Sequence, residues 1–263
     1  MTELHAQSTW PETDGLSIAL SNQVLTIRLD HPDKRNAITY DMYSAITERL
    51  RAAAEDPGVR CVVIAATGAI FTGGHDISGF ARGLDLAPEE KPSFAFMQTL
   101  ARFPKPVIAA VNGDAVGIGA TMLLHCDLVY AVPEARIVFP FVDMGLVPEF
   151  AATHWLPRMI GHRRAMALFL CEGRCSAQRA LEWGIVNETH PADQLAGHVS
   201  RAAARIAGLS PEAVRQTKRL LRKADADAVD AAITEEAQIL HDLLGSDIAR
   251  EKLAAIRQRI SKG

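Results

Sequence analysis

The stretch VIAAVNGDAVGIGATMLLHCD, residues 107–127, begins with five apolar residues, passes three glycines within seven positions and ends in a mostly apolar, helix-like run. A short run of apolar residues is typical of a strand that is covered on both faces. Glycines that follow a buried strand usually mark a place where another group approaches the backbone closely. The stretch therefore predicts a buried strand, a glycine-rich loop and a helix behind it.

A second segment repeats this arrangement roughly 45 residues earlier, a period within the range of stacked strand–helix repeats. VIAATGAIFTGG begins at Val63 and VIAAVNGDAVGIG begins at Val107, and each joins an apolar strand to a glycine and then to a second glycine cluster. The repeat predicts two glycine-rich loops at the same end of adjacent strands. Two backbone N–H groups from such loops can converge on one oxygen atom.

Three functional interpretations compete for these loops. A dinucleotide-binding fingerprint requires GxGxxG, whereas Gly113, Gly117 and Gly119 give GxxxGxG with no acidic residue at the proper strand end. A P-loop requires Gly-Lys-Ser/Thr, which this sequence lacks. An oxyanion hole needs only two backbone amides, with glycines nearby and a helix N-terminus behind them. Close strand–helix packing would explain a single loop, and the pair of loops favours the oxyanion hole.

The remaining patterns indicate an α/β chain with a helical C-terminal part. Apolar–polar alternation predicts strands, apolar residues at helical spacing predict helices, and proline suits the first position of a helix. The expected elements are a hairpin of strands 16–20 and 24–29, a helix over 38–54, strands at 61–66 and 136–139, a loop over 81–93, a helix over 94–103, a helix that begins at Pro148, and helices from about residue 176 onward.

Length, composition and charge restrict the class of protein. A chain of 263 residues suits one large α/β domain or two small ones, and 48% apolar with 22% charged residues is ordinary for a globular protein. The net charge of −3 argues against a nucleic-acid partner. No stretch reaches 18 uninterrupted apolar residues, and the N-terminus has no apolar signal-peptide core. We therefore expect a cytoplasmic protein with no membrane partner.

The cysteines give no sign of a metal centre. Cys61, Cys126, Cys171 and Cys175 have no spacing that completes a zinc site. We expect buried, reduced thiols and predict no metal. The motifs GxSxG and HExxH are both missing from the sequence, which argues against serine-hydrolase and zinc-protease activity.

Four segments, in order, resemble regions of one known family. FTGGHDI (71–77) and KPVIAAVNGDAVGIGATMLLHCDLVYA (105–131) resemble the two signature segments of the crotonase superfamily of enoyl-CoA hydratases and isomerases. HPDKRNAIT (31–39) resembles the early CoA-contacting turn of that superfamily. LCEGRCSAQRALEWGIVNETHP (170–191) resembles the segment that precedes its C-terminal helices.

The resemblance implies a fold, a substrate class and an assembly. The fold would be an α/β spiral of ββα repeats over residues 1–200, holding CoA and the active site, followed by a C-terminal helical trimerisation region over 201–263. The substrate would be an acyl-CoA thioester, with no further cofactor. The chain would assemble as a homotrimer or hexamer.

The resemblance also implies roles for individual residues. The backbone N–H groups of His75 and Ile118 would hold the thioester oxygen, on which negative charge develops when a proton leaves the neighbouring carbon. Loss of one well-placed donor of this kind typically raises the barrier by about 2.7–4 kcal/mol. Contacts with CoA would come from Lys34, Arg35, Ala37, Asp76, Ile77 and Arg259. Alternatively, Lys34 and Arg35 form a solvated turn, and Asp76 holds its loop by accepting backbone hydrogen bonds.

Two positions depart from the pattern of the superfamily. Its hydratases add water with two glutamates, and this chain has Thr121 and Phe141 at those positions. Neither side chain titrates near neutral pH, so neither can deprotonate water. Standard two-glutamate hydration is therefore in doubt, which leaves hydration by other residues as an alternative.

Glu149, in GLVPEFAATHWLPRMIG (145–161), is the remaining candidate base. The stretch resembles the Δ3,Δ2-enoyl-CoA isomerases, which carry a catalytic glutamate at this place and need only one acid/base. Apolar neighbours such as Pro148 and Phe150 favour a raised pKa, whereas a helix N-terminus favours the anion. Glu149 could instead be an ordinary first-turn residue. The chain could then be a CoA-binding scaffold without activity, since a fold does not fix a function.

Overall fold

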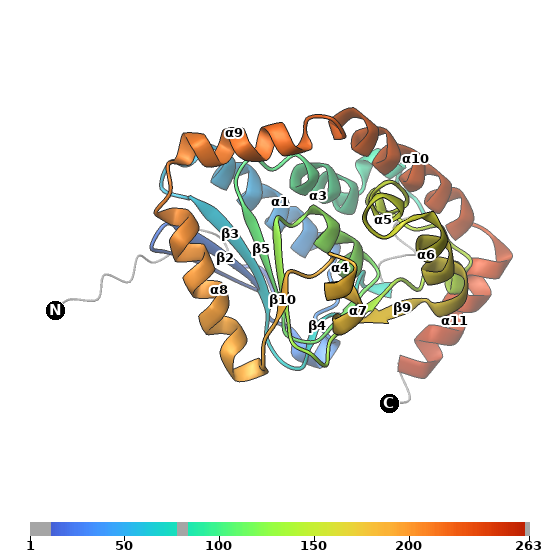
Figure 1. Ribbon diagram of the computed structural model, residues 1–263. Helices are drawn as coiled ribbons and strands as arrows, with labels where there is room; N and C mark the ends of the chain where they lie inside the picture. Colours follow the sequence, from blue (N-terminus) through green and yellow to red (C-terminus); the bar gives the residue numbers. More distant parts are fainter. Residues whose placement is uncertain (1–11, 78–83, 261–263) are drawn as a thin grey trace.

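Two β-sheets surrounded by helices make up the computed structural model, which describes residues 12–77 and 84–260 (Figure 1). The larger sheet has six strands in the order β1-β2-β3-β5-β7-β10, and the smaller sheet has four in the order β4-β6-β8-β9. The strands are β1 (Leu16–Ser21), β2 (Val24–Leu29), β3 (Cys61–Ala66), β4 (Ile70–Thr72), β5 (Val107–Val111), β6 (Asp114–Val116), β7 (Leu128–Ala131), β8 (Arg136–Val138), β9 (Arg174–Ser176) and β10 (Glu188–Thr189).

Helices connect the strands and form most of the C-terminal part. The α-helices are α1 (Tyr40–Glu55), α3 (Pro92–Ala101), α4 (Ile118–Thr121), α5 (Ala152–Ile160), α6 (His162–Ala167), α7 (Ala177–Glu182), α8 (Ala192–Ala207), α9 (Pro211–Arg222), α10 (Ala226–Leu244) and α11 (Asp247–Ile260). The other helical turns are η1 (Pro32–Lys34), η3 (Pro88–Glu90), η4 (Met122–His125), η5 (Val142–Met144) and η6 (Leu168–Glu172).

The larger sheet is built on wholly apolar central strands. β2, β3, β5, β7 and β10 run parallel, and β1 pairs antiparallel with β2. All of β5 is buried, as expected for a strand covered on both faces. The predicted hairpin is confirmed, since Ser21 pairs with Val24 across a two-residue turn. Asn22 and Gln23 in that turn both have positive φ, 51° and 64°, which is the backbone that suits the twist of a hairpin.

Each strand of the smaller sheet that lies near the glycine loops follows directly on a strand of the larger sheet. β4 comes after β3, β6 after β5 and β8 after β7, and β4, β6 and β8 run parallel. The turn between β5 and β6 packs on the preceding turn, because a Cβ atom at Gly113 would lie 2.0 Å from the carbonyl oxygen of Ala69. This repeated arrangement confirms the predicted α/β spiral.

The C-terminal helices lie against the core rather than apart from it. α8 contacts four strands of the larger sheet, and α10 contacts both α3 and α5. Figure 1 shows α8 on one side of the larger sheet, with α4, α7 and β9 on the other. Residue 200 falls inside α8, and the division into a core and a C-terminal region at this position stays a prediction.

Several sequence-based expectations about local structure were wrong. The helix expected from Pro148 begins at Ala152, because Phe150 and Ala151 have left-handed backbones with φ of 64° and 53°. The segment after residue 176 is mostly helical as predicted, and its short strand β10, which pairs with β7, was not predicted. Cys171 is exposed, although the four free thiols were expected to be buried.

The segment predicted as a loop over 81–93 is partly ordered into helix. η3 forms at Pro88–Glu90, and α3 begins at Pro92 rather than at 94. Residues 81–83 of that predicted loop lie outside the described residues.

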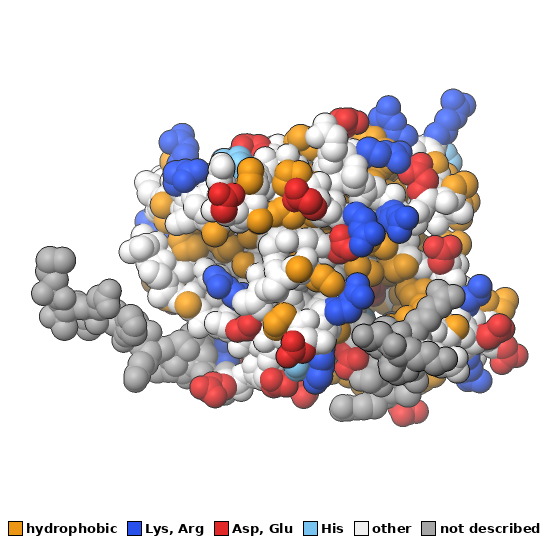
Figure 2. All heavy atoms as spheres, turned by 90° about the horizontal axis from the view of Figure 1, so that it is seen from below, with side chains coloured by type: hydrophobic (Ala, Val, Ile, Leu, Met, Phe, Trp, Pro, Cys, Tyr) orange, Lys and Arg blue, Asp and Glu red, His pale blue; other side chains and the backbone are white. Residues whose placement is uncertain are grey.

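The surface of the molecule carries charged side chains of both signs. Figure 2 shows acidic and basic side chains interspersed on one face of the molecule. Across residues 12–77 and 84–260, no helix is both long enough and apolar enough to cross a bilayer.

Candidate active site

The two glycine-rich loops meet at the ends of β4 and β6, which are neighbouring parallel strands. Gly74 follows β4 with a φ of +91°, and a Cβ atom on it would lie 2.7 Å from the carbonyl oxygen of Val116. A side chain at this position would push the loops apart, and its backbone would be strained. Glycine therefore permits the contact that brings His75 and Ile118, the residues after each loop's glycine, to the same edge of the sheet.

Thr72 and Asn36 brace the first loop. The hydroxyl of Thr72 donates to the carbonyl oxygen of Asn36 at 2.6 Å and accepts the N–H of Gly74 at 3.0 Å. The amide of Asn36, which is fully buried, donates to the carbonyl oxygens of Thr67 and Ile70. These bonds fix the loop on both sides of β4, as a preorganised oxyanion site requires.

The same network joins the predicted CoA-contacting turn to the first loop. Ile38 donates its N–H to Gly74 at 2.8 Å and accepts the N–H of Asp76 at 3.0 Å. Lys34 and Arg35 are exposed beside it, and Ala37, Asp76 and Ile77 are partly buried. Arg259 lies in α11, but its side chain is not among those that the structure describes. The structure therefore brings five of the six predicted CoA-contacting residues together, and their role stays a prediction.

Ile118 is the first residue of α4 and is buried. The carbonyl oxygen of Gly117 accepts the N–H groups of Ala120 and Thr121, so these amides are used within the helix. The first N–H groups of a helix have no acceptor in the helix itself, and that of Ile118 is such a group. Its position is consistent with the role that the resemblance implies.

Glu149 is carried by a left-handed turn rather than by a helix. Phe150 and Ala151 form this turn, and both are fully buried with Pro148 beside them, while Glu149 is only partly buried. His125 Nε2 lies 2.7 Å from the carbonyl oxygen of Phe150. Burial lowers the pKa of His125 to about 3, so the ring is neutral and donates this hydrogen bond. The idea that Glu149 is an ordinary first-turn residue is therefore wrong.

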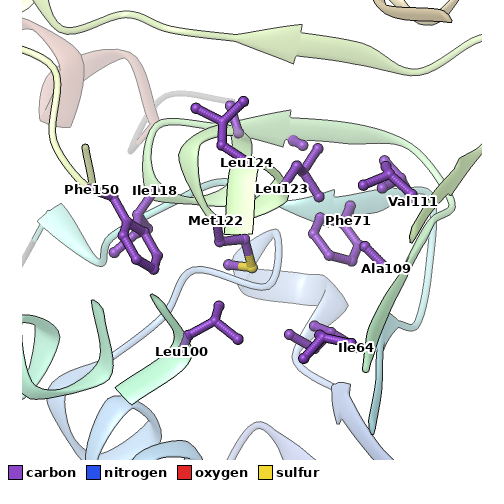
Figure 3. Packing of buried hydrophobic residues seen from close by; sticks show 14 of the residues in the cluster. Ile64, Phe71, Leu100, Ala109, Val111, Ile118, Met122, Leu123, Leu124 and Phe150 are labelled. Atoms are coloured by element: carbon purple, nitrogen blue, oxygen red, sulfur yellow. The ribbon is translucent and has the colours of Figure 1, made fainter. Parts of the chain in front are cut away.

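A chain of aromatic rings connects the first glycine loop to the turn that carries Glu149. Ring centroids lie 5.5 Å apart between His75 and Tyr43, 5.5 Å between Tyr43 and Phe96, and 5.8 Å between Phe96 and Phe150. In Figure 3, Ile118 and Phe150 lie at the same side of the labelled core, opposite Ile64 on the sheet. The first glycine loop and the turn that carries Glu149 therefore pack against the same aromatic cluster.

The groups around Glu149 change its pKa. Burial, and then the nearby carboxylate of Glu236, raise its pKa to about 7, and Lys91 opposes this rise. Lys91 is 8% exposed, and its Nζ lies 2.9 Å from Nδ1 of His241. Burial and Glu149 raise the pKa of Tyr43 well above its usual value, so the phenol stays neutral. Burial lowers the pKa of His75 to about 4, which leaves this ring neutral at pH 7.

Four residues of this site were missed by sequence reasoning: Tyr43, Lys91, Glu236 and His241. Tyr43 and Glu236 lie within ordinary amphipathic helices, and no local pattern distinguishes them from core or surface residues. Lys91 lies in the segment 81–93, for which the sequence predicted only a loop. Thr121 and Phe141 occupy the two positions where hydratases carry glutamates, so no carboxylate is supplied there. Both side chains are buried, at 0% and 3% exposed.

One group of side chains within the described residues has the spacing of metal ligands. Glu188, His190 and His198 each offer one atom, and these atoms lie within 4.8 Å of one another. The Oε2 atom of Glu188 already lies 3.0 Å from Nε2 of His190 and 3.5 Å from Nε2 of His198. The cluster lies on β10, on α8 and on the link between them rather than on the elements that carry Glu149.

Comparisons with known proteins match most of the length of the chain. The model of the enoyl-CoA hydratase/isomerase family matches residues 19–259. The chain is 30% identical to the 2,3-dehydroadipyl-CoA hydratase of Escherichia coli (strain K12), over 93% of this chain and 96% of that protein. It is 31% identical to enoyl-CoA delta isomerase 2 of Rattus norvegicus, over 87% of this chain and 60% of that protein. The solved structure of OdaA from Pseudomonas aeruginosa has a TM-score of 0.89 and 41% identity, covering 93% of this chain and 99% of that one.

Proposed function

The chain belongs to the enoyl-CoA hydratase/isomerase family of the crotonase superfamily, and we propose that it isomerises a 3-enoyl-CoA to the 2-enoyl-CoA with Glu149 as its single acid/base. The observation that carries this proposal is the contrast between Glu149 and the two positions used for hydration. Glu149 has a pKa of about 7, which suits both taking and returning a proton. The side chains of Thr121 and Phe141 can neither take nor return a proton near neutral pH.

The reaction needs one base and one oxyanion site. The Glu149 carboxylate removes a proton from C2 of the substrate, and the electron pair of that C–H bond moves into a dienolate with its negative charge on the thioester oxygen. The N–H groups of His75 and Ile118 stabilise this oxygen. Glu149 then gives the proton to C4, and the double bond is left between C2 and C3. The proton lost is the proton regained, so no water and no cofactor enter the balance.

The remaining features of the site fit a CoA thioester. Lys34 and Arg35 are exposed at the turn next to the first loop, where cations can meet the phosphates of CoA. The first glycine loop is hydrogen-bonded to this turn through Ile38, and the rings of Tyr43 and Phe96 join the loop to the turn that carries Glu149. This order is the one expected if the thioester follows the CoA moiety into the site. A homotrimer or hexamer stays a prediction.

Two alternatives make different predictions for a substrate panel of 2-enoyl-, 3-enoyl- and branched acyl-CoA thioesters. The proposed isomerase converts 3-enoyl-CoA faster than it hydrates 2-enoyl-CoA, measured by chromatography of the products. A hydratase that uses other residues would give 3-hydroxyacyl-CoA as the main product. A non-catalytic scaffold would bind the thioesters in calorimetry and convert none of them. Either of these two results would refute the proposal.

The pH dependence of isomerisation should report the raised pKa of Glu149. The base acts as the carboxylate, so kcat/KM should rise with pH and level off above about 7, instead of near the usual glutamate value of 4.5. Below the midpoint the rate should fall about tenfold per pH unit, since only the ionised fraction reacts. Steady-state kinetics between pH 5 and 9 would measure this. A rate that stays constant down to about pH 5 would show that another group, or an unshifted Glu149, is the base.

A further inference from the structure

The start of α5 is held by a residue that is far away in the sequence. Ala151 precedes the first residue of α5, and its methyl group cannot accept the N–H groups that open a helix. Such groups need a partner, usually the side chain of the residue at this position. Here the partner is Glu236 of α10. Its Oε2 accepts the N–H of Ala151 at 2.6 Å, and its Oε1 accepts the N–H of Thr153 at 3.0 Å.

Glu236 is a buried acceptor with both oxygens occupied. It is 5% exposed, and Oε1 also accepts the hydroxyl of Thr153 at 2.5 Å. Burial raises the pKa of Glu236 to about 7. The hydrogen bonds from Thr153 and Ala151 oppose this rise, because backbone N–H groups can only donate and therefore favour the ionised form. A buried carboxylate with such partners costs much less than an unpaired one.

The geometry points to Glu236 as a positioning residue, which fixes the left-handed turn that carries Glu149 and places a second negative charge beside it. This inference rests on the proposed role of Glu149 as the acid/base. Glu236 accepts the N–H of Ala151, the residue after Phe150, and so holds the turn from the side of α10. His125 holds the same turn from η4 through the carbonyl oxygen of Phe150.

The two carboxylates differ in how well they bear a charge. Among the described residues, no hydrogen bond to the carboxylate of Glu149 is formed, whereas Glu236 accepts three. When the pair takes up its first proton, the proton therefore goes to Glu149. The remaining anion of Glu236 then raises the pKa of Glu149, and burial acts in the same direction.

Other charged and titratable groups face this pair from each neighbouring element. They are Lys91 before α3, Tyr43 on α1, His125 on η4 and His241 on α10. Glu235 on α10 is exposed to solvent and has the smallest effect on the pKa of Glu236. Lys91 opposes the effect of Glu236 on Glu149, and the Tyr43 phenol and the His125 ring are neutral near pH 7. Glu236 is thus the anionic group whose removal should change the proton affinity of Glu149 most directly.

The test compares Glu236→Gln with Glu235→Gln. Glu235 is the neighbouring glutamate on α10 and is exposed, so it is a matched control for loss of one charge from this helix. The first readout is the pH titration of the Glu149 carboxyl carbon by NMR on protein labelled with ¹³C-glutamate, assigned with Glu149→Gln. In Glu236→Gln we expect the midpoint to fall by about one pH unit, because a like charge nearby has been removed. In Glu235→Gln it should stay within a few tenths of a unit.

The second readout is the acid limb of kcat/KM for isomerisation, which should move in step with the NMR midpoint. Glu236→Asp keeps the charge but shortens the reach to Ala151 and Thr153. It should keep a midpoint near that of the wild type and lose at least tenfold in kcat. A purely structural Glu236 would lower kcat in both variants and move neither midpoint, and that result would overturn the inference.

The NMR titration does not depend on turnover. If the protein proved inert on enoyl-CoA substrates while the Glu149 midpoint still moved in Glu236→Gln, the proposed function would fail and the electrostatic coupling would stand. If Glu236→Gln did not fold, the titration of the wild-type protein would still decide the case, because the Glu236 carboxyl carbon is observed in the same spectra. We expect Glu149 to take up its proton at a higher pH than Glu236, and the reverse order would leave no anion beside Glu149 and would refute the role of that charge.

Discussion

Glu149→Gln is expected to reduce isomerisation of 3-enoyl-CoA by about 10²–10⁴-fold, which is the usual contribution of a general acid/base. Glutamine has the same shape and cannot take or return a proton at neutral pH. The turn that carries position 149 is held by His125 and Glu236 through its backbone, so the substitution should leave the loop in place. The loss should appear in kcat and kcat/KM equally, measured by steady-state kinetics at pH 8.

Two measurements accompany this prediction. Calorimetric titration with a CoA thioester should give nearly the same affinity for Glu149→Gln and the wild type, because the predicted CoA contacts lie on the other loops. Glu182→Gln changes an exposed glutamate of α7 and should leave turnover unchanged. Robust hydration of 2-enoyl-CoA that survives Glu149→Gln would show that both the reaction and the base are assigned wrongly.

Gly74→Ala should reduce turnover by about 10²–10³-fold, the effect of losing one oxyanion donor. The added Cβ atom would lie 2.7 Å from the carbonyl oxygen of Val116, and the φ of +91° does not suit alanine. The first loop must then move away from the second, and the N–H of His75 moves with it. Steady-state kinetics would measure the loss of kcat.

Gly184→Ala is the matched control for backbone strain. Gly184 also has a positive φ, +75°, but nothing lies within 4 Å of a Cβ atom added there. This variant should lose some stability, roughly 1 kcal/mol, and keep its turnover. Equal losses of turnover in both variants, after correction for the folded fraction, would mean that strain alone explains the effect and that contact between the loops is not needed.

Much of the fold could be predicted because its signals are local. The apolar runs of β3 and β5, the hairpin turn at Asn22 and Gln23, and the repeated glycine clusters each reflect what a short segment needs from its immediate neighbours. The convergence of the two loops followed from the rule that adjacent parallel strands place their following loops at one edge. The start of the helix after Glu149 was predicted wrongly, because Pro148 was expected to be its first residue. The left-handed backbone at Phe150 and Ala151, which delays the helix to Ala152, leaves no signal in the local sequence.

The sequence by itself determined the identity of the base candidate, the absence of carboxylates at positions 121 and 141, and the two loops that can hold an oxyanion. These depend on which residue occupies a place in a recognisable pattern. Only the tertiary structure decided the pKa of that candidate base. Glu236 reaches the turn from α10, and Lys91 approaches Glu149 from the segment before α3. Burial and Coulomb interactions depend on distance in space rather than along the chain, so the pKa of Glu149 cannot be read from the residues beside it.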